Sequence, residues 1–510
     1  MDTSAPAQQR RLQETSKRGF SSGSGGMDAF MEFEREMAMK RRQQQEKLLE
    51  YELSLLAQTQ KPQQRLAVPE PKYVVTYLDN DSPSSAQQQR LRENNLAVFD
   101  ITTNEMISAP HRTKDNWWRS VRHIELHVRD EQKEYVGENA SNIAVFVPND
   151  VSVVDRMIVH LQVDPDLIFT AEAIVLEADS SALNAVPKHF TLDRPFESIG
   201  SVREALTWSF DLISTPRASF LRKLAAFATS EDEVQALLAP HALDDLATER
   251  PGQPVTVADI FDHFPSLRLN FAAFFQIAPL NAPRYYTVSS SRRFFPNIVS
   301  ITLGLKELDT QPVPRCSSYL SALSPGKHTI RASFFHSTFV FPQQDRHPLL
   351  LVSAGTGIAP FRAFLQDLEH ERYEEQQQQL EPFVATTSAA DQPRTRHRNA
   401  YLFYGCRSPE VDFLYADELH EAHAQRVLDQ LHVYVQDALR EQSALVVDHL
   451  MRQRGYLFVC GSLAMGRAVK HAIVDALVAH ADVSGAATED AAKALVTQWL
   501  ENGQLVTELW

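Results

Sequence analysis

The segment from Leu349 to Arg362 constrains the fold of this chain more than any other. An apolar run, Leu349-Leu-Leu-Val352, leads into Gly355-Thr-Gly357, and Pro360 follows. This order predicts a buried strand, a tight turn and the first turn of a helix. Backbone N–H groups are free at a helix N-terminus and receive phosphate there. The segment therefore predicts a dinucleotide-binding turn in an α/β domain.

Strand and helix patterns alternate over residues 346–510, which predicts a doubly wound parallel sheet with ligands at the carboxyl ends of its strands. A Gln-rich stretch at 374–398 breaks the alternation, and we expect a disordered surface insertion there. The expected elements are Leu349–Ser353, Phe361–Arg372, Ala400–Tyr404, Asp417–Leu428, His432–Val435, Ser443–Arg452, Tyr456–Cys460 and Met465–Ala481.

A second motif, Arg284-Tyr-Tyr-Thr287, lies upstream in residues 116–345. A basic side chain beside aromatic rings and hydroxyls suits a ligand with a pyrophosphate at one end and a flat ring system at the other, such as FAD. Strand patterns flank the motif and predict an antiparallel barrel, whereas about 155–265 has a helical pattern and predicts an insertion. The expected strands are 124–128, 143–147, 285–289, 298–303 and 334–341.

Composition narrows the class of protein. The chain has 510 residues, 43% of them hydrophobic, which suffices for two or three domains with cores. No run approaches the ~20 apolar residues of a membrane helix, and the N-terminus has no apolar signal core, so we expect a cytoplasmic protein without membrane insertion. The net charge of −15 argues against nonspecific nucleic-acid binding. Three isolated cysteines are too few for a disulfide framework or a Cys-ligated cluster, and we predict no metal site.

Residues 1–115 differ from the rest. They are rich in Gln, Ser, Glu and Arg and contain a Gly/Ser linker at 21–26, so we expect them to be largely disordered. Within them, the stretch 28–56 places Phe30, Phe33 and Met37 on one helical face. Two interpretations stay open: a marginal solvated helix, or a helix that docks on a partner.

Taken in order, the motifs resemble the FAD/NADP(H) half of the diflavin reductases, the family that includes cytochrome P450 reductase. The resemblance covers about Trp117 to Trp510. Within the family the chain looks most like the NADPH-dependent diflavin oxidoreductase of cytosolic iron–sulfur cluster assembly, through Ser214–Phe220 and Thr507–Trp510. The family motifs are Arg284-Tyr-Tyr-Thr287, Cys316-Ser-Ser-Tyr-Leu320, Gly355-Thr-Gly-Ile-Ala-Pro-Phe-Arg362, Tyr404-Gly-Cys-Arg407, Asp412-Phe-Leu-Tyr415, Val433-Tyr-Val-Gln436 and Phe458-Val-Cys-Gly461.

The chain departs from the family in three places. Its first hundred residues show neither the strands nor the hydroxyl-rich phosphate loop of the family's FMN domain, so a one-flavin relative is expected. Relatives place a Ser-Arg pair and a Lys at the adenosine 2′-phosphate, where this chain aligns Arg426, Val427 and His432, and the choice between NADPH and NADH stays open. Finally, Pro314-Arg315 replaces a Gly and an apolar residue before Cys316.

The resemblance implies FAD contacts on two segments. On the first, Arg284 would hold the pyrophosphate, Tyr286 would stack on the isoalloxazine, and Thr287 would hydrogen-bond near its reactive nitrogen. Tyr285 belongs to the same set. On the second, a helix start would bring backbone N–H groups and hydroxyls to the pyrophosphate. Its residues are Arg315, Cys316, Ser317 and Ser318.

The implied NADPH contacts lie mostly at strand ends, where Gly355, Thr356 and Gly357 would cradle the nucleotide. Further contacts are implied at Cys406, Arg407, Arg426, His432, Tyr434, Gln436 and Cys460. The implied catalytic set is Thr287, Cys460, Glu508 and Trp510. Cys460 would orient the nicotinamide and Glu508 would stabilise charge that develops during transfer. The Trp510 ring would cover the flavin and swing away to admit the nicotinamide.

The implied function is an FAD-dependent NAD(P)H oxidoreductase that moves a hydride from NADPH to FAD and then passes single electrons to a separate acceptor protein. The expected acceptor is an FMN or iron–sulfur protein, with a role in cytosolic iron–sulfur cluster assembly. Two alternatives stay open. One is a reductase for a haem or methionine-synthase-type partner, and the other is a non-catalytic scaffold that retains the reductase fold. The oligomeric state stays unknown.

Overall fold

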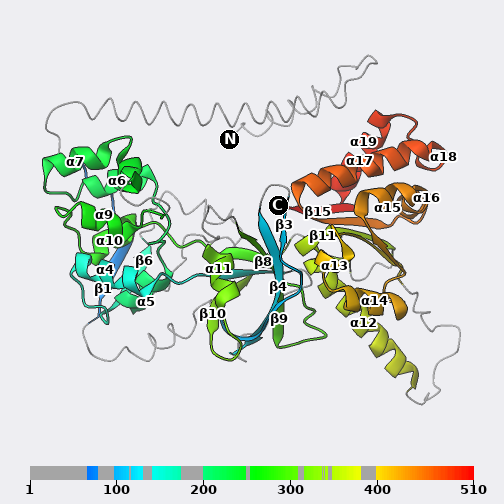
Figure 1. The fold of residues 1–510 in the computed structure, drawn as a ribbon, viewed down its shortest axis with the longest axis horizontal. Coiled ribbons are helices and arrows are strands. Elements are labelled where there is room, and N and C mark those ends of the chain that lie inside the picture. Colours follow the sequence, from blue (N-terminus) through cyan, green and yellow to red (C-terminus); the bar gives the residue numbers. More distant parts are fainter. Residues whose placement is uncertain are drawn as a thin grey trace, which may run out of the picture.

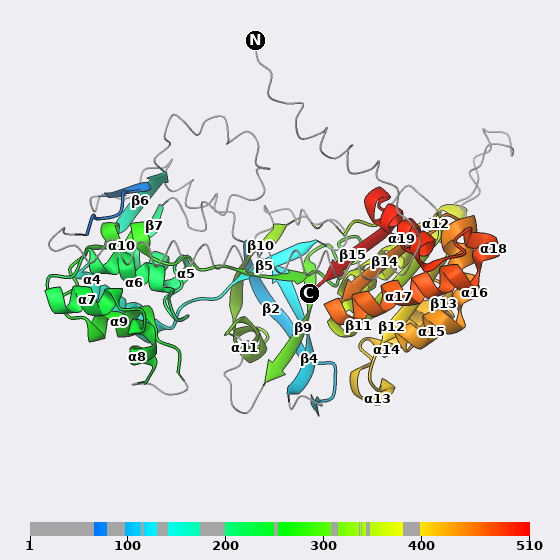
Figure 2. The ribbon, with the colours of Figure 1, turned by 90° about the horizontal axis from the view of Figure 1, so that it is seen from above.

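The structure is a computed structural model of the 510-residue chain. It describes residues 66–78, 97–113, 117–129, 141–173, 199–248, 253–307, 315–335, 337, 339–342, 347–380 and 398–510. Figures 1 and 2 show three parts in a row: a helical body, a curled antiparallel sheet and an α/β domain. The helix expected within 28–56 lies outside the described residues. Within them, no helix combines the length and the apolar character that crossing a membrane requires.

The middle part is an antiparallel sheet that curls into a barrel. Its strand order is β3-β4-β2-β10-β5-β8, and β9 also pairs with β4. A bridge between Val288 and Ile301 joins the end of β8 to β9, so the two ends of the sheet meet. The strands are β2 (Ala97–Met106), β3 (His111–Arg112), β4 (Trp118–Val128), β5 (Asn142–Phe146), β8 (Arg284–Thr287), β9 (Ile298–Glu307) and β10 (Thr329–Phe335).

The barrel differs from its sequence prediction at both ends. Residues 1–115 were expected to be largely disordered, but β2 lies inside the sheet between β4 and β10. Its Phe99 and Ile101 are fully buried because their side chains pack in the core of the barrel. At the other end, a strand was expected over 334–341, but β10 ends at Phe335. Phe339 and Phe341 pack instead into the core of the α/β domain.

The helical body is the insertion between β5 and β8, and it is larger than expected. Helices run from α4 to α10, over 151–277 instead of about 155–265. A three-stranded antiparallel sheet, β1-β6-β7, joins them and was not predicted. Its β1 comes from the segment expected to be disordered. The elements are β1 (Tyr73–Tyr77), α4 (Val151–Leu161), β6 (Ile168–Ala173), β7 (Ile199–Ser201), α5 (Val202–Trp208), α6 (Ala218–Ala225), α7 (Glu231–Leu238), α8 (Ala242–Thr248), α9 (Val257–His263) and α10 (Phe271–Ile277).

The α/β domain holds a five-stranded parallel sheet in the order β13-β12-β11-β14-β15, with helices on both faces. The predicted fold class, a barrel with a helical insertion followed by a doubly wound parallel sheet, is confirmed. The strands are β11 (Leu349–Ala354), β12 (Ala400–Gly405), β13 (Gln430–Val433), β14 (Tyr456–Gly461) and β15 (Leu505–Leu509). The helices are η3 (Gly355–Ile358), α12 (Ala359–Leu380), α13 (Pro409–Asp412), α14 (Ala416–Ala424), α15 (Val435–Glu441), α16 (Ser443–Val447), η4 (Asp448–Arg452), α17 (Leu463–Ala479), α18 (Ala481–Ser484) and α19 (Glu489–Asn502).

Three details of this domain differ from the prediction. Helix α12 continues to Leu380, into the stretch expected to be a disordered insertion, while 381–397 lie outside the described residues. The expected strand through Val435 ends at Val433, and α15 begins at once. The last elements, α19 and β15, were not predicted. Strand β15 has only five residues and is recognisable mainly through its parallel pairing with β14.

Candidate active site at the domain junction

The dinucleotide turn lies where the prediction placed it, at the carboxyl end of β11. Gly355 has a φ of +56°, and a Cβ built on it would meet no atom within 4 Å. Gly357 is the opposite case, because its Cβ would lie 2.2 Å from the carbonyl oxygen of Cys460. Only glycine fits so close to the end of β14. The turn is thus packed tightly on one side and open on the other, which fits a nucleotide phosphate.

Cys460 and Glu508 lie side by side on β14 and β15, where they are register partners. Cys460 is fully buried, and its Sγ lies 4.0 Å from a carboxylate oxygen of Glu508. Burial raises the pKa of both groups. The nearby Glu508 charge further raises the pKa of the thiol. A thiol that stays protonated is a poor nucleophile, which agrees with a role for Cys460 in orientation.

Trp510 is held by its backbone and leaves its ring accessible. Its N–H donates to the carbonyl of Gly461 at 3.1 Å, and its carbonyl accepts from the N–H of Leu463 at 3.1 Å. The residue is nevertheless 54% exposed. Both views place this end of the chain between the barrel and the α/β domain (Figures 1 and 2). A ring there can lie over a ligand bound at the junction.

Strand β8 presents the predicted flavin motif. Arg284 is exposed and forms no ion pair within the described part of the chain, so its guanidinium can receive a pyrophosphate. Tyr285 is 50% exposed and packs edge-to-face on Phe335. Tyr286 points the other way and donates its hydroxyl to Sγ of Cys316 at 3.3 Å. Thr287 is half-buried. That Tyr286 rather than Tyr285 stacks on the flavin stays a prediction.

The second FAD segment is the start of α11 (Arg315–Ala322), as expected. Burial raises the pKa of the Cys316 thiol, which packs into the barrel core. Ser317 is half-buried and Ser318 is exposed, so the first turn of the helix carries accessible hydroxyls. The bond between Tyr286 and Cys316 joins this helix start to β8. The two predicted FAD segments therefore form one surface.

The Arg315 side chain bonds to groups outside these two segments. Its guanidinium donates to the carbonyl of Pro148 at 2.5 Å and to Oδ1 of Asn149 at 3.1 Å, and it lies 3.6 Å from a carboxylate oxygen of Asp211. Burial lowers its pKa. These acceptors come from the border between barrel and insertion. Arg315 thus ties α11 to the insertion, and that it also contacts FAD stays a prediction.

Two further predicted contacts lie at the carboxyl end of β12. Cys406 is half-buried, and burial followed by the nearby Asp412 raises its pKa. Arg407 is exposed, its N–H donates to Oδ1 of Asp412 at 2.8 Å, and its guanidinium contacts His111 of the barrel. Arg407 therefore stands beside the dinucleotide turn, on the side that faces the barrel.

The predicted 2′-phosphate contacts are not brought together. Arg426 precedes β13, in a loop where the N–H of Asp429 donates to the carbonyl of Ala400 at the start of β12. This loop lies at the amino edge of the sheet, opposite the turn. His432 lies mid-strand, its ring stacked on Phe403 at 4.6 Å, and burial lowers its pKa, so it is neutral near pH 7. That Arg426 and His432 contact the 2′-phosphate stays a prediction.

Tyr434 and Gln436 do follow the carboxyl end of β13. Tyr434 has a φ of +74° and is 50% exposed, and Gln436 lies in the first turn of α15. A helix start beside an exposed ring suits an adenosine. Among the described residues of that turn, the charged side chain is Asp437 rather than an arginine.

Sequence reasoning missed a group of residues that joins the two domains. Arg362 of α12 donates from Nη1 to the carbonyl of Ser289 at 2.7 Å and pairs with Glu418 of α14 at 2.6 Å. Tyr415 reaches His123 and Thr302 of the barrel. Arg362 and Tyr415 each end a family motif, which was the available signal, but their partners are distant in sequence.

Comparisons with protein families agree with this site. Residues 94–317 match the family model of an FAD binding domain, and 351–471 match that of an oxidoreductase NAD-binding domain. The fold and these matches therefore define the FAD-binding and NAD(P)-binding domains of a flavoprotein oxidoreductase, and they confirm FAD and a nicotinamide dinucleotide as the cofactors. Among the described residues, no group of acidic, histidine and cysteine side chains could hold a metal ion.

Individual relatives narrow the class. NADPH–cytochrome P450 reductase of Dictyostelium discoideum is 28% identical over 458 residues, which cover 84% of this chain and 61% of that protein. Inducible nitric oxide synthase of Bos taurus is 33% identical over 287 residues, which cover 53% of this chain and 23% of that protein. The same enzyme of Homo sapiens is 30% identical over 312 residues, which cover 57% of this chain and 25% of that protein. Over its FAD- and NAD-binding domains, the chain is thus similar to a cytochrome P450 reductase and to nitric oxide synthases. The matches span less than two thirds of each of these relatives.

Proposed function

We propose that this protein moves a hydride from NADPH to FAD and passes the electrons singly to an acceptor protein. One observation carries the proposal: Arg362, from the helix that begins at the dinucleotide turn, donates to the carbonyl of Ser289, two residues after the flavin strand. The segments that bind the two cofactors are therefore joined by a direct hydrogen bond. Hydride transfer needs such fixed alignment of two rings.

FAD accepts electrons as a pair and can release them one at a time, which is the chemistry that the cofactor supplies. The protein binds and orients. Arg284 offers positive charge to a pyrophosphate, and the first turn of α11 offers N–H groups and hydroxyls. Gly355 leaves room for phosphate at the other cofactor. The half-buried Glu508 offers a carboxylate near the end of β14, where positive charge develops on a nicotinamide that gives up hydride.

The absorption spectrum of the purified protein under anaerobic conditions tests this proposal. We expect a flavin band that NADPH bleaches within seconds, and an oxidised one-electron acceptor should restore it. A protein that takes up no added FAD, or whose flavin NADPH does not bleach, would contradict the proposal and favour the scaffold.

For the acceptor, we propose an FMN or iron–sulfur protein of the cytosol, in iron–sulfur cluster assembly. The support is the sequence similarity of Ser214–Phe220 and Thr507–Trp510 to the reductase of that process. A haem protein is the second candidate, because one relative is by name a cytochrome P450 reductase. Rates of reduction of purified flavodoxin-like, iron–sulfur and haem acceptors by the NADPH-reduced protein distinguish them. A haem acceptor reduced fastest would contradict the assembly role.

A further inference from the structure

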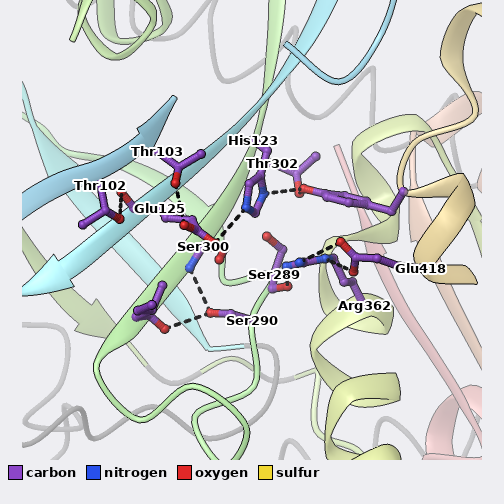
Figure 3. A network of polar contacts seen from close by, with 12 residues as sticks. Thr102, Thr103, His123, Glu125, Ser289, Ser290, Ser300, Thr302, Arg362 and Glu418 are labelled. Atoms are coloured by element: carbon purple, nitrogen blue, oxygen red, sulfur yellow. Dashed lines mark hydrogen bonds and ion pairs between the residues drawn. The ribbon is translucent and has the colours of Figure 1, made fainter. Parts of the chain in front are cut away.

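The interface between barrel and α/β domain contains a connected set of polar side chains (Figure 3). The barrel contributes His123 and Glu125 of β4 and Thr302 of β9. The α/β domain contributes Arg362 of α12 and Glu418 of α14. It also contributes Tyr415, the residue at the N-terminal cap of α14. None of these was assigned a role by the sequence motifs.

Tyr415 is the centre of this set. Its hydroxyl lies 3.0 Å from Nδ1 of His123 and 2.8 Å from Oγ1 of Thr302. His123 and Thr302 are cross-strand partners on β4 and β9, so the hydroxyl reaches two neighbouring barrel strands at once. On the other side, the guanidinium of Arg362 lies 4.6 Å from the centre of the Tyr415 ring. The ring is therefore held from both domains.

The backbone of Tyr415 shows that this placement is costly. Its φ is +55° and its ψ +33°, the left-handed conformation that residues with a Cβ rarely adopt. Burial raises the pKa of the hydroxyl, so it stays a hydrogen-bond donor. A strained backbone persists where surrounding contacts over-determine it. Here those contacts belong largely to the other domain.

Only one arrangement of protons satisfies the whole set. Burial, and then Arg362, lower the pKa of His123, so its ring is neutral near pH 7. Burial alone would raise the pKa of Glu125, but hydrogen bonds from Thr103 and His123 bring it below its usual value. Because a carboxylate only accepts, His123 donates from Nε2 to Glu125 and accepts at Nδ1 from Tyr415. The Tyr415 oxygen then accepts from Thr302.

The contact lies next to the dinucleotide turn. Thr302 and Gly304 lie two residues apart on β9 and thus share a face of the strand, about 7 Å apart. A Cβ on Gly304 would lie 3.4 Å from Cγ2 of Thr356, the middle residue of the turn. The same face of β9 therefore seats the turn and binds Tyr415. Tyr415 also closes the loop that begins at Arg407, beside the nucleotide edge.

We propose that Tyr415 is a positioning residue: through His123 and Thr302 it fixes the α/β domain on the barrel, so that a nicotinamide held at the turn meets the flavin held on β8. This inference rests on the proposed function. It concerns alignment between two bound cofactors and not the affinity for either one, and this difference makes it testable.

The test compares Tyr415→Phe with wild type and with Tyr401→Phe. Tyr401 lies on β12 against His449, within the α/β domain. Tyr401→Phe removes one tyrosine hydroxyl, as Tyr415→Phe does, and is therefore the matched control. In anaerobic stopped-flow, we expect Tyr415→Phe to slow flavin reduction by about tenfold or more at saturating NADPH, with FAD content and NADPH affinity unchanged. The long-wavelength absorbance that reports nicotinamide–flavin stacking should weaken. Thr302→Val should do the same from the barrel side, and the double variant should add little.

Small-angle X-ray scattering gives a readout that does not depend on hydride transfer. We expect a larger radius of gyration for Tyr415→Phe and Thr302→Val than for wild type and Tyr401→Phe. If wild type is bleached by NADPH and Tyr415→Phe is reduced as fast as Tyr401→Phe, positioning by Tyr415 is refuted while the proposed function stands. If wild type is not bleached, the function fails, and identical scattering curves for all variants would then refute the domain contact as well.

Discussion

Gly357→Ala is the substitution with the most sharply defined effect at the dinucleotide turn. The new Cβ would lie 2.2 Å from the carbonyl oxygen of Cys460 and 2.7 Å from its carbonyl carbon. Ordinary carbon contacts begin near ~3.4 Å, so the turn must move away from β14 by about 1 Å. Strand β14 cannot yield easily, because β11 and β15 pair with it on both sides.

A displacement of this size is large for catalysis. A shift of about 1 Å in a bound reactant can cost about a hundredfold in rate. We expect Gly357→Ala to slow anaerobic flavin reduction by NADPH about a hundredfold. FAD content should be unchanged because Arg284 and α11 belong to the barrel. Overpacking should also cost about 1–3 kcal/mol of stability in the α/β domain, which a thermal scan detects.

The control is Gly485→Ala, where a Cβ meets nothing within 4 Å and the φ of +70° imposes only the backbone cost of a left-handed alanine. It should lower the melting temperature slightly and leave flavin reduction at the wild-type rate. The reasoning about the turn would be refuted by a Gly357→Ala protein that reduces its flavin at the wild-type rate with an unchanged melting temperature. In that case the turn is looser than its contact with β14 indicates.

Three further predictions concern residues away from that turn. Asp367 is buried against Ser291 of the barrel, and burial raises its pKa to about 6. The stability that this carboxyl contributes is complete below its ordinary pKa and is lost as the pH rises through about 6. The free energy of unfolding of Asp367→Asn should therefore rise by about 1 kcal/mol relative to wild type between pH 5 and pH 7. A difference in melting temperature that stays the same at both pH values would contradict this. Arg426→Ala should leave the ratio of kcat/KM for NADPH to kcat/KM for NADH unchanged, because Arg426 lies at the amino edge of the sheet. A tenfold fall in that ratio would show that Arg426 contacts the coenzyme. Arg315→Ala should weaken FAD retention and lower the melting temperature by several degrees, because it frees α11 from Pro148 and Asn149, and FAD fluorescence after gel filtration measures the loss.

The sequence alone determined the elements whose signals are local. The run from Leu349 through Gly355 to Pro360 specifies strand, turn and helix within a few residues, since backbone sterics and helix-end hydrogen bonding act over that range. The period-two pattern around Ile124 and Leu126 did the same for β4. The cofactor motifs on β8 and β11 could therefore be placed before any tertiary contact was known.

The tertiary structure decided which distant residues meet. Strand β2 is a barrel strand because it pairs with β4 and β10, and Arg315 donates to a carbonyl that only the folded insertion brings near. The expected strand through Val435 ends at Val433 because α15 begins at Val435. The contact of Tyr415 with His123 joins residues 292 positions apart. No local pattern encodes such a pair, because its energy arises only when two separately folded domains pack together.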